Sequence, residues 1–444
     1  MWGPARAGFR APGKPLQLRR SLLTSALFSQ KTATLTVTPK TGLADEVLDI
    51  QVEGLGPRER VTLRASAASH RGRHFHSLAH YEADVRGGLH LARDPALGGD
   101  FTGVEPMGLL WSLTPAEDLF LGQMPRGVMK NPLKVEVTVH HMSRQPGEQL
   151  GPALASAQIQ RWFASPELSR TRLQTGRLRG VFLLPPGDGP FPGLIDMFGD
   201  GGLNESRASL LSCRGFATLA LPFFGYEDLP PIMKNLNLDY FEEAAKFVQS
   251  HPKVKGPNIG VIGSGKGAEL AFSMASFLPN IAAVVSINGC ISNTATALTC
   301  GRFVLPGLPF NLDKISATDS GVYDVKEALE DPLNPAYQES RIPLEKASAH
   351  FLFIVGEDDR HWKSSAYAAI AMKHLTEHGK TNFTLLNYPN AGHRIDPPYS
   401  PFFSVALDPV LGLPVLGGGQ LKAHAVAQIE SWKKILEFLH LHLG

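Results

Sequence analysis

Hydrophobic and polar residues alternate one for one through much of the first third of the chain. The alternation is clearest in four short runs, at residues 34–38, 47–52, 60–65 and 134–139, with glycine and proline between them. A period of two puts successive side chains on opposite faces of a strand, so that one face can be buried. Short strands of this kind predict an antiparallel β-sandwich domain over residues 32–165. The pattern leaves open whether this domain shapes the mouth of a site or is purely structural.

A different pattern begins beyond a boundary near residues 165–179. Predicted strands, most of their residues apolar, lie at 178–184, 193–198, 217–221, 258–262, 282–287, 351–355 and 383–388, and helices at 207–212, 238–250, 268–278, 364–378 and 423–441. Continuous apolar strands joined by helices predict a parallel sheet covered on both faces. Residues 166–444 are therefore expected to form an α/β domain, with residues 290–344 as an excursion or cap over the sheet.

The most specific motif stands between the strand at 258–262 and the helix at 268–278. It reads Gly263-Ser264-Gly265-Lys266-Gly267. In α/β-hydrolases a strand enters a sharp turn of the form Gly-x-nucleophile-x-Gly, whose small flanking residues let the central side chain stand at the apex. The frame of this nucleophile elbow is therefore present, but its central position is a glycine, which has no side chain to attack a substrate.

Ser264 is a fallback nucleophile, in a register shifted by one residue. Its neighbours two positions away would then be Ile262 and Lys266, which are bulky where the turn requires small residues. With Gly265 at the apex, both of those positions are glycine. We therefore predict that Ser264 points away from the apex and that Gly265 marks the nucleophile position.

The partners of a hydrolase nucleophile are expected on two later loops, the acid before the histidine. The apolar strand at 351–355 leads into the acidic run 357–359, and the strand at 383–388 leads into a turn that ends at His393. We select Asp359 over Asp358 as the acid, although composition does not separate them, and His393 as the base. In isolation the acidic run would suit a solvated loop with an ion pair to Arg360, but its position after an apolar strand favours the catalytic interpretation.

An oxyanion hole requires backbone N–H groups from an early βα loop and from the residue after the nucleophile. The glycine-rich run 199–202 follows the strand at 193–198, and Lys266 follows the elbow apex. We predict that Gly199, Asp200, Gly201 and Lys266 form this hole. The alternative is an ordinary flexible turn, and the nearby elbow favours the oxyanion role.

The first thirty or so residues differ in composition from the rest. The first acidic residue is Asp45, and residues 16–28 can form a basic amphipathic helix within a segment that carries Arg6, Arg10, Lys14, Arg19, Arg20 and Lys31. This composition is typical of a mitochondrial transit peptide, which we place at residues 1–31. It predicts a mitochondrial matrix protein, with the cytosol as the alternative location. A disordered tail or a mis-assigned start codon would account for the same composition.

Composition narrows the function classes further. The formal net charge is +2, with 43% hydrophobic and 19% charged residues, which suits a globular protein and argues against a nucleic-acid partner. The cysteines, Cys213, Cys290 and Cys300, are an odd number without zinc-ligand spacing, which favours a reducing compartment and no metal site. No apolar run is long enough for a membrane span, and no cofactor is expected.

Several motifs occur together in one known family. They are the elbow segment 260–270, the segments 98–100, 106–113, 196–199, 353–359 and 391–399, and Lys422-Ala423-His424-Ala425. With them the chain, from about Thr32 to Gly444, resembles the type I acyl-CoA thioesterase and bile acid-CoA:amino acid N-acyltransferase family. The resemblance implies an N-terminal β-sandwich, a C-terminal α/β-hydrolase catalytic domain and fatty acyl-CoA as substrate. It also implies a triad of Ser or Cys, Asp and His, with Asp359 and His393 aligned to the last two. The arginine-rich leader fits the mitochondrial branch.

The chain departs from the family at the apex, where thioesterases have serine and transferases have cysteine. Three hypotheses follow from Gly265. The first is a thioesterase that hydrolyses fatty acyl-CoA to free fatty acid and CoA, with His393 activating water directly but slowly. The second is a non-catalytic acyl-CoA binder. The third, acyl transfer to glycine or taurine, is the least favoured because it requires a thiolate at the apex.

Overall fold

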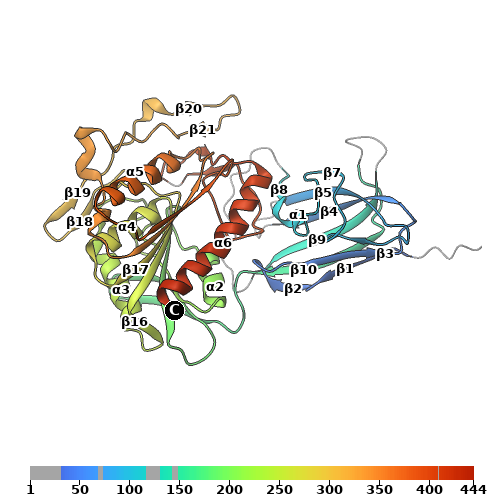
Figure 1. The fold of residues 1–444 in the computed structure, drawn as a ribbon, viewed down its shortest axis with the longest axis horizontal. Helices are drawn as coiled ribbons and strands as arrows, with labels where there is room; N and C mark the ends of the chain where they lie inside the picture. Colours follow the sequence, from blue (N-terminus) through green and yellow to red (C-terminus); the bar gives the residue numbers. More distant parts are fainter. Residues whose placement is uncertain (1–31, 69–73, 117–130, 143–148, 409) are drawn as a thin grey trace, which may run out of the picture.

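The computed structural model describes residues 32–68, 74–116, 131–142, 149–408 and 410–444, which form an all-β part and a larger part of mixed strands and helices (Figure 1). The leader predicted at residues 1–31, with its basic helix at 16–28, lies outside the described residues. Within the described residues, no helix is both long enough and apolar enough to cross a bilayer.

The all-β part consists of two sheets that share one hydrophobic core. The smaller sheet has the order β1-β3-β6 and the larger the order β2-β10-β9-β4-β5-β7, with β8 paired to β5. The strands are β1 (Thr34–Thr38), β2 (Thr41–Leu43), β3 (Asp49–Glu53), β4 (Arg60–Ala68), β5 (His74–Glu82), β6 (Leu89–His90), β7 (Gly98–Gly99), β8 (Thr114–Pro115), β9 (Leu133–His141) and β10 (Ala155–Trp162). The predicted period-two runs fall on β1, β3, β4 and β9, and their apolar positions line the shared core. The pairing is antiparallel except between β2 and β10.

The second part is built on one eight-stranded sheet of order β11-β12-β14-β13-β16-β17-β22-β23. Its strands are β11 (Ser169–Thr175), β12 (Leu178–Leu184), β13 (Phe191–Phe198), β14 (Ala217–Ala220), β16 (Val254–Ser264), β17 (Ile281–Ile287), β22 (His350–Gly356) and β23 (Phe383–Tyr388). From β14 to β23 all neighbours are parallel. Every strand predicted beyond residue 178 from apolar runs is present, which confirms an α/β fold.

The prediction of a parallel sheet is wrong at one edge. Strand β12 runs antiparallel to both β11 and β14, and β11 occupies the segment that was expected to be a domain boundary. In β11 only Leu173 is buried, because this edge strand has solvent on most of its surface. A strand so polar lacks the apolar signal by which the other strands were recognised.

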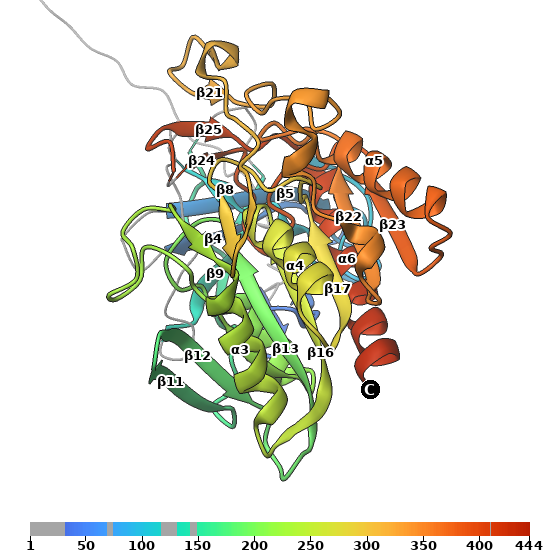
Figure 2. The ribbon, with the colours of Figure 1, turned by 90° about the vertical axis from the view of Figure 1, so that its left-hand side faces the viewer.

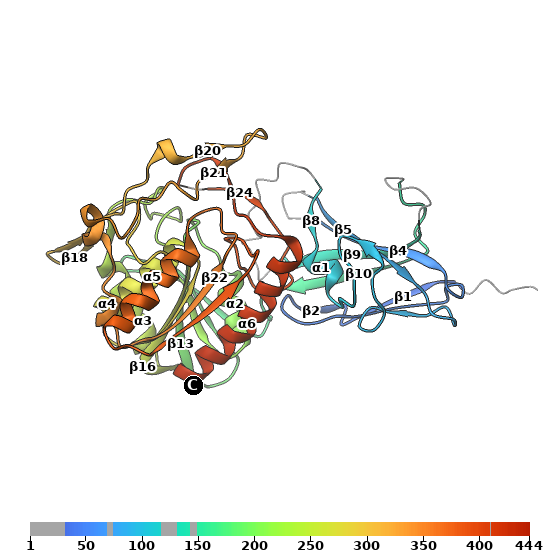
Figure 3. The ribbon, with the colours of Figure 1, turned by 45° about the horizontal axis from the view of Figure 1, so that its top comes forward.

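Helices cover both faces of this sheet, as predicted. One face packs against α3 (Leu238–Ser250), α4 (Lys266–Phe277) and α5 (Ser364–Glu377), and the other against α2 (Ser206–Cys213) and α6 (Leu421–Leu443). Helix α6 lies on the side of the sheet that faces the all-β part, where its Ala425 joins the core of that part and α1 (Gly108–Trp111) approaches it (Figure 3). The long terminal helix therefore links the two cores.

The excursion predicted at residues 290–344 is a cap of short elements above the carboxyl ends of the strands (Figure 2). It contains β18 (Leu298–Cys300), β19 (Phe303–Leu305), β20 (Ser316–Ala317), β21 (Tyr323–Asp324) and the 3-10 turns η1 (Leu312–Lys314) and η2 (Pro335–Ser340), and η3 (Leu344–Lys346) follows it. It pairs with β15 (Leu236–Asn237) and with the hairpin of β24 (Val405–Leu407) and β25 (Pro414–Leu416). Together these segments cover the carboxyl ends of the strands.

Candidate active site

The elbow has the backbone that its sequence predicts. Strand β16 ends at Ser264, α4 begins at Lys266, and Gly265 between them has φ 56° and ψ −122°. This conformation strains any residue that carries a side chain. The flanking glycines are required for a different reason, which is space. A Cβ on Gly263 would lie 2.2 Å from the carbonyl carbon of Gly267, and a Cβ on Gly267 would lie 2.5 Å from a backbone oxygen.

At the apex, by contrast, there is room for a side chain. A Cβ on Gly265 would lie 3.4 Å from Nε2 of His393 and 3.4 Å from Cζ2 of Trp362, which are ordinary van der Waals distances. A hydroxymethyl group at this position would therefore face the imidazole. The turn thus leaves space at Gly265 for a side chain directed at His393, but glycine supplies none.

Ser264 does not take over that place. Its Oγ accepts a hydrogen bond of 2.6 Å from Nη1 of Arg207, a buried arginine that also pairs with Asp196 at 2.5 Å. The Ser264 hydroxyl is thus directed into a structural ion-pair network next to β13. The prediction that Ser264 points off the apex agrees with this geometry.

Asp359 and His393 lie together, as the loop positions predict. Oδ2 of Asp359 is 2.8 Å from Nδ1 of His393. The same carboxylate accepts hydrogen bonds from the backbone N–H groups of His361, at 2.8 Å, and Trp362, at 3.2 Å, and from the hydroxyl of Ser364. Burial favours the neutral acid, but His393, the hydroxyl of Ser364 and the charge of His361 outweigh it and lower the pKa of Asp359.

Asp358 is directed elsewhere. It pairs with Nε of Arg360 at 2.9 Å and accepts a hydrogen bond of 2.9 Å from the backbone N–H of Gly419. An ion pair to Arg360 is the alternative interpretation of the acidic run 357–359. In the structure this interpretation applies to Asp358 and not to Asp359. The structure therefore separates the two neighbouring aspartates that composition could not.

The surroundings of His393 favour its neutral imidazole. Burial lowers its pKa, the carboxylate of Asp359 raises it, and the neighbouring His361 and Arg394 lower it, so that the net shift is downward. A neutral imidazole whose Nδ1–H donates to Asp359 has its lone pair on Nε2. That atom lies 3.4 Å from the position that a Cβ on Gly265 would take.

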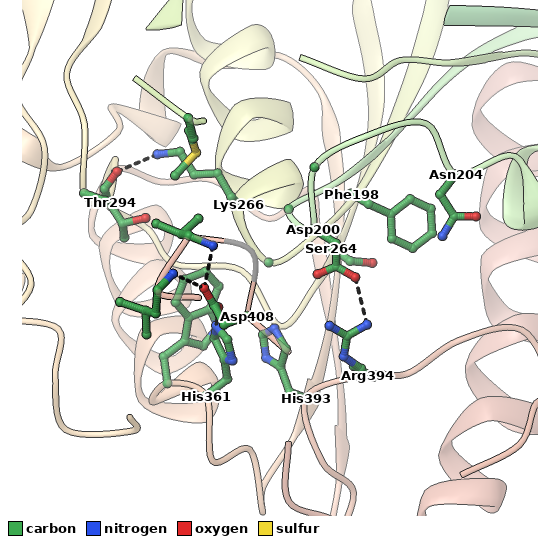
Figure 4. Close-up of a pocket in the computed structure, with 18 of the residues that line it drawn as sticks. Phe198, Asp200, Asn204, Ser264, Lys266, Thr294, His361, His393, Arg394 and Asp408 are labelled. Atoms are coloured by element: carbon green, nitrogen blue, oxygen red, sulfur yellow. Dashed lines mark hydrogen bonds and ion pairs between the residues drawn. The ribbon is translucent and has the colours of Figure 1, made fainter. Parts of the chain in front are cut away.

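Two neighbours of His393 were missed in the sequence. The ring of His361 stacks on the ring of His393, with centroids 4.4 Å apart and planes 17° from parallel, and its Nε2 lies 3.2 Å from Oδ2 of Asp408 (Figure 4). Burial lowers the pKa of His361, but Asp408 more than compensates, and the net shift is upward. Trp362 packs edge-on against His393 at 5.4 Å. His361 and Trp362 follow Asp359 by two and three positions, but no sequence pattern at these positions indicates contact with His393.

The glycine run lies where an oxyanion hole would be. A Cβ on Gly199 would be 3.0 Å from the backbone nitrogen of Lys266, so the two backbones adjoin. As the first residue of α4, Lys266 has an N–H without a partner inside the helix. Its ammonium group turns away and pairs with Glu269 at 2.7 Å. The carboxylate of Asp200 pairs with Arg394 at 2.8 Å, and Gly201 has φ 68°.

A cavity of about 160 Å³ joins these groups. Its lining is mixed: Gly265, His393 and His361 stand beside the polar residues Asp200, Lys266, Thr294, Arg394, Asp396 and Asp408, and Phe198, Met233, Phe310, Val410 and Leu411 form the apolar part of the wall. Such a cavity suits a ligand with a reactive polar group and an apolar body. None of the cysteines Cys213, Cys290 and Cys300 is among the described residues that line it.

The fold and this geometry define an α/β-hydrolase with an N-terminal β part. Two family models match the chain, "Acyl-CoA thioester hydrolase/BAAT N-terminal region" at residues 45–175 and "BAAT / Acyl-CoA thioester hydrolase C terminal" at residues 236–444. The chain belongs to this acyl-CoA thioester hydrolase and BAAT family.

Two curated relatives are similar over nearly the whole chain. Acyl-coenzyme A thioesterase 1 of Homo sapiens is 45% identical over 402 residues, which is 90% of this chain and 94% of that protein. Mitochondrial acyl-coenzyme A thioesterase 2 of Homo sapiens is also 45% identical, over 90% of this chain and 82% of that protein. Among solved structures, an acylaminoacyl peptidase of Pyrococcus horikoshii is 13% identical with a TM-score of 0.41, over 90% of this chain and 60% of that chain. A likeness this distant adds nothing to the fold already described.

Proposed function

We propose that this protein hydrolyses fatty acyl-CoA to free fatty acid and CoA, with a water molecule as the direct nucleophile. The observation that carries the proposal is the position of Nε2 of His393, 3.4 Å from the place of a Cβ on Gly265. A base and its acid are assembled around a position that is open to a small molecule. The relatives named as acyl-CoA thioesterases support the substrate class.

The reaction is a single displacement at the thioester carbonyl. Nε2 of His393 takes a proton from water while the water oxygen attacks the carbonyl carbon, and Asp359 holds the imidazole and stabilises its charge. The negative charge that develops on the carbonyl oxygen is placed against the N–H groups of the 199–201 loop and Lys266. The carbon–sulfur bond then breaks, and His393 returns the proton to the sulfur of CoA. No acyl-enzyme forms.

Without a covalent nucleophile, this turnover is expected to be slow. Removal of a triad serine costs about a million-fold in kcat, and a residual acceleration of about a thousand-fold or more remains from the oxyanion hole and binding. A measurable but low rate is therefore consistent with Gly265.

Gly265 also favours a second candidate, a non-catalytic protein that binds acyl-CoA in the same cavity. The two candidates share the fold, the cavity and the ligand, and they differ only in whether His393 drives turnover. Acyl transfer to glycine or taurine remains the least favoured, because no cysteine lines the described cavity and a transferase of this type needs a thiolate.

The test compares CoA release from a long-chain acyl-CoA by the unmodified chain and three variants. We expect slow release that His393→Ala abolishes, that Ser264→Ala leaves unchanged and that Gly265→Ser raises by orders of magnitude. Binding without any release by the unmodified chain would support the binder instead. Release that is lost in Ser264→Ala would assign the nucleophile to Ser264 and contradict the proposal.

For the location, we propose the mitochondrial matrix and a role there in fatty acid metabolism. The basic composition of residues 1–31 and the similarity to a relative named as mitochondrial support this. A fluorescent fusion of the full chain should colocalise with mitochondria, and a fusion without residues 1–31 should remain cytosolic. A full-chain fusion in the cytosol would favour the alternative location.

A further inference from the structure

The backbone of His393 is held by a buried side chain that belongs neither to the triad nor to the cavity wall. His424, in the first turn of α6, is buried, with 4% of its surface exposed. Its Nδ1 accepts a hydrogen bond of 3.1 Å from the N–H of Gly392, and its Nε2 donates one of 2.7 Å to the carbonyl of Arg394. One imidazole thus contacts the residue before His393 and the residue after it.

This double contact requires a neutral ring in one tautomer. Nδ1 can accept a hydrogen bond from the N–H of Gly392 only if it carries no hydrogen itself, and Nε2 of the neutral ring must then carry the hydrogen. Burial lowers the pKa of His424 to about 4, so the ring is neutral at neutral pH. His424 is suited to a fixed structural contact and not to proton transfer.

A second buried side chain holds the same turn from the end of β17 (Ile281–Ile287), two strands away in the sheet. Asn288 follows β17 and is fully buried. Its Nδ2 donates to the carbonyls of His393, at 2.7 Å, and Gly392, at 3.2 Å. Its Oδ1 accepts a hydrogen bond of 2.8 Å from the N–H of Gly356, at the end of β22. Because β22 leads directly to Asp359, Asn288 joins the loop of the acid to the loop of the base.

The backbone of Asn288 also holds Trp362, which lines the cavity. Its carbonyl accepts a hydrogen bond of 2.6 Å from Nε1 of Trp362. The ring of Trp362 lies edge-on to His393 and in contact with the apex at Gly265. Asn288 therefore orients both the turn that carries the base and the aromatic surface against which the base packs.

We propose that His424 and Asn288 are positioning residues for the catalytic base. Together they hold the turn 392–394 so that Nε2 of His393 faces the apex and Nδ1 faces Asp359. The motif Lys422-Ala423-His424-Ala425 would then contribute to the site by positioning His393 through His424. The proposal rests on the proposed function only in taking His393 as the base.

The first test reads the His393–Asp359 hydrogen bond without any turnover. Proton NMR of the full chain should show a low-field imidazole N–H resonance that disappears in His393→Gln. We expect this resonance to be lost or strongly shifted in His424→Phe, which keeps an aromatic ring but loses both hydrogen bonds. His140→Phe is the matched control. His140 is also buried and lies in β9, 2.8 Å from the carbonyl of Gly151 and 2.8 Å from Oγ1 of Thr138.

The second test measures kinetics in a Gly265→Ser background. We expect His424→Phe to lower kcat about a hundred-fold with little change in KM, since a displaced base costs about this much. His424→Gln, which can both donate and accept, should recover part of the loss, and His140→Phe should have no effect. Asn288→Asp should behave like His424→Phe, because it places a carboxylate oxygen against two carbonyls while it keeps the contact to Gly356.

An unchanged low-field resonance together with unchanged kcat in His424→Phe would overturn the proposal. Equal losses in His140→Phe and His424→Phe would also overturn it, because they would indicate a general loss of packing. If Gly265→Ser shows no turnover, the proposed function fails, and the NMR comparison still decides whether His424 and Asn288 position His393.

Discussion

Two physical constraints act on Gly265, and they favour different residues: the surrounding space admits a side chain, whereas the backbone conformation favours glycine. The space around it admits a side chain, with the nearest atoms 3.4 Å from a Cβ. Its φ of 56° favours glycine, and a side chain there would strain the backbone by about 1–3 kcal/mol. A glycine at this apex therefore avoids backbone strain but provides no nucleophilic side chain. Asp359 and His393 nevertheless remain hydrogen-bonded to each other beside it.

The pH dependence of the reaction is set by three charged or titratable groups that face His393, namely Asp359, His361 and Arg394. His393 must be neutral to act as a base, so the rate should rise with pH through its pKa. Because the net shift is downward, we expect this rise to centre below the usual histidine value of 6.5.

The contribution of His361 to this profile can be isolated. Its positive charge opposes protonation of His393, so His361→Gln should raise the pKa of His393 and move the rise to higher pH. The measurement is kcat/KM against pH in the Gly265→Ser background, with the parent as the control. A profile that stays in place, or that moves to lower pH, would show that the stacked ring does not act on the base electrostatically.

At the scale of elements, the strand–turn–helix of the elbow depends on its flanking glycines. We expect Gly263→Ala to destabilise the protein by about 1–3 kcal/mol or more, because the added Cβ overlaps the backbone at the start of α4. Gly151→Ala is the control, since a Cβ there has no atom within 4 Å and φ is ordinary. Urea unfolding of both variants measures the difference. Equal stability would contradict the close approach of β16 and α4.

Elements also differ in how well they could be predicted. The elbow, the acid loop and the base loop were predictable because each follows a buried strand whose apolar run is continuous. Strand β11 was not, because its only buried residue is Leu173. Asn288 was not either. It lies 105 positions before His393 in the chain, and no local pattern distinguishes an asparagine that caps a strand from one that binds a distant carbonyl.

At the scale of the whole molecule, Asp45 makes one of the contacts that attach the all-β part. Its carboxylate accepts hydrogen bonds from Nε of Arg214, at 2.9 Å, and from Nε1 of Trp432, at 3.1 Å. Arg214 follows α2, and Trp432 lies in α6, so one acidic side chain joins the early segment to both helices on that face of the sheet. The association of the two parts should depend on it.

We expect Asp45→Ala to lower the free energy of unfolding by about 1–3 kcal/mol, since it removes a charged acceptor that is largely buried. Thermal unfolding should then show two transitions, because the parts lose a shared contact. Glu437→Ala, at an exposed position on α6, is the control and should leave a single transition. A single unshifted transition in Asp45→Ala would contradict this account of the junction.

The most direct test of the central claim is intact-protein mass spectrometry of the enzyme quenched during turnover of a long-chain acyl-CoA. Direct attack by water predicts that the unmodified chain releases CoA while its mass stays unchanged, and that Gly265→Ser accumulates a mass increase of one acyl group. An acyl group on the unmodified chain would contradict the claim, and so would a complete absence of CoA release.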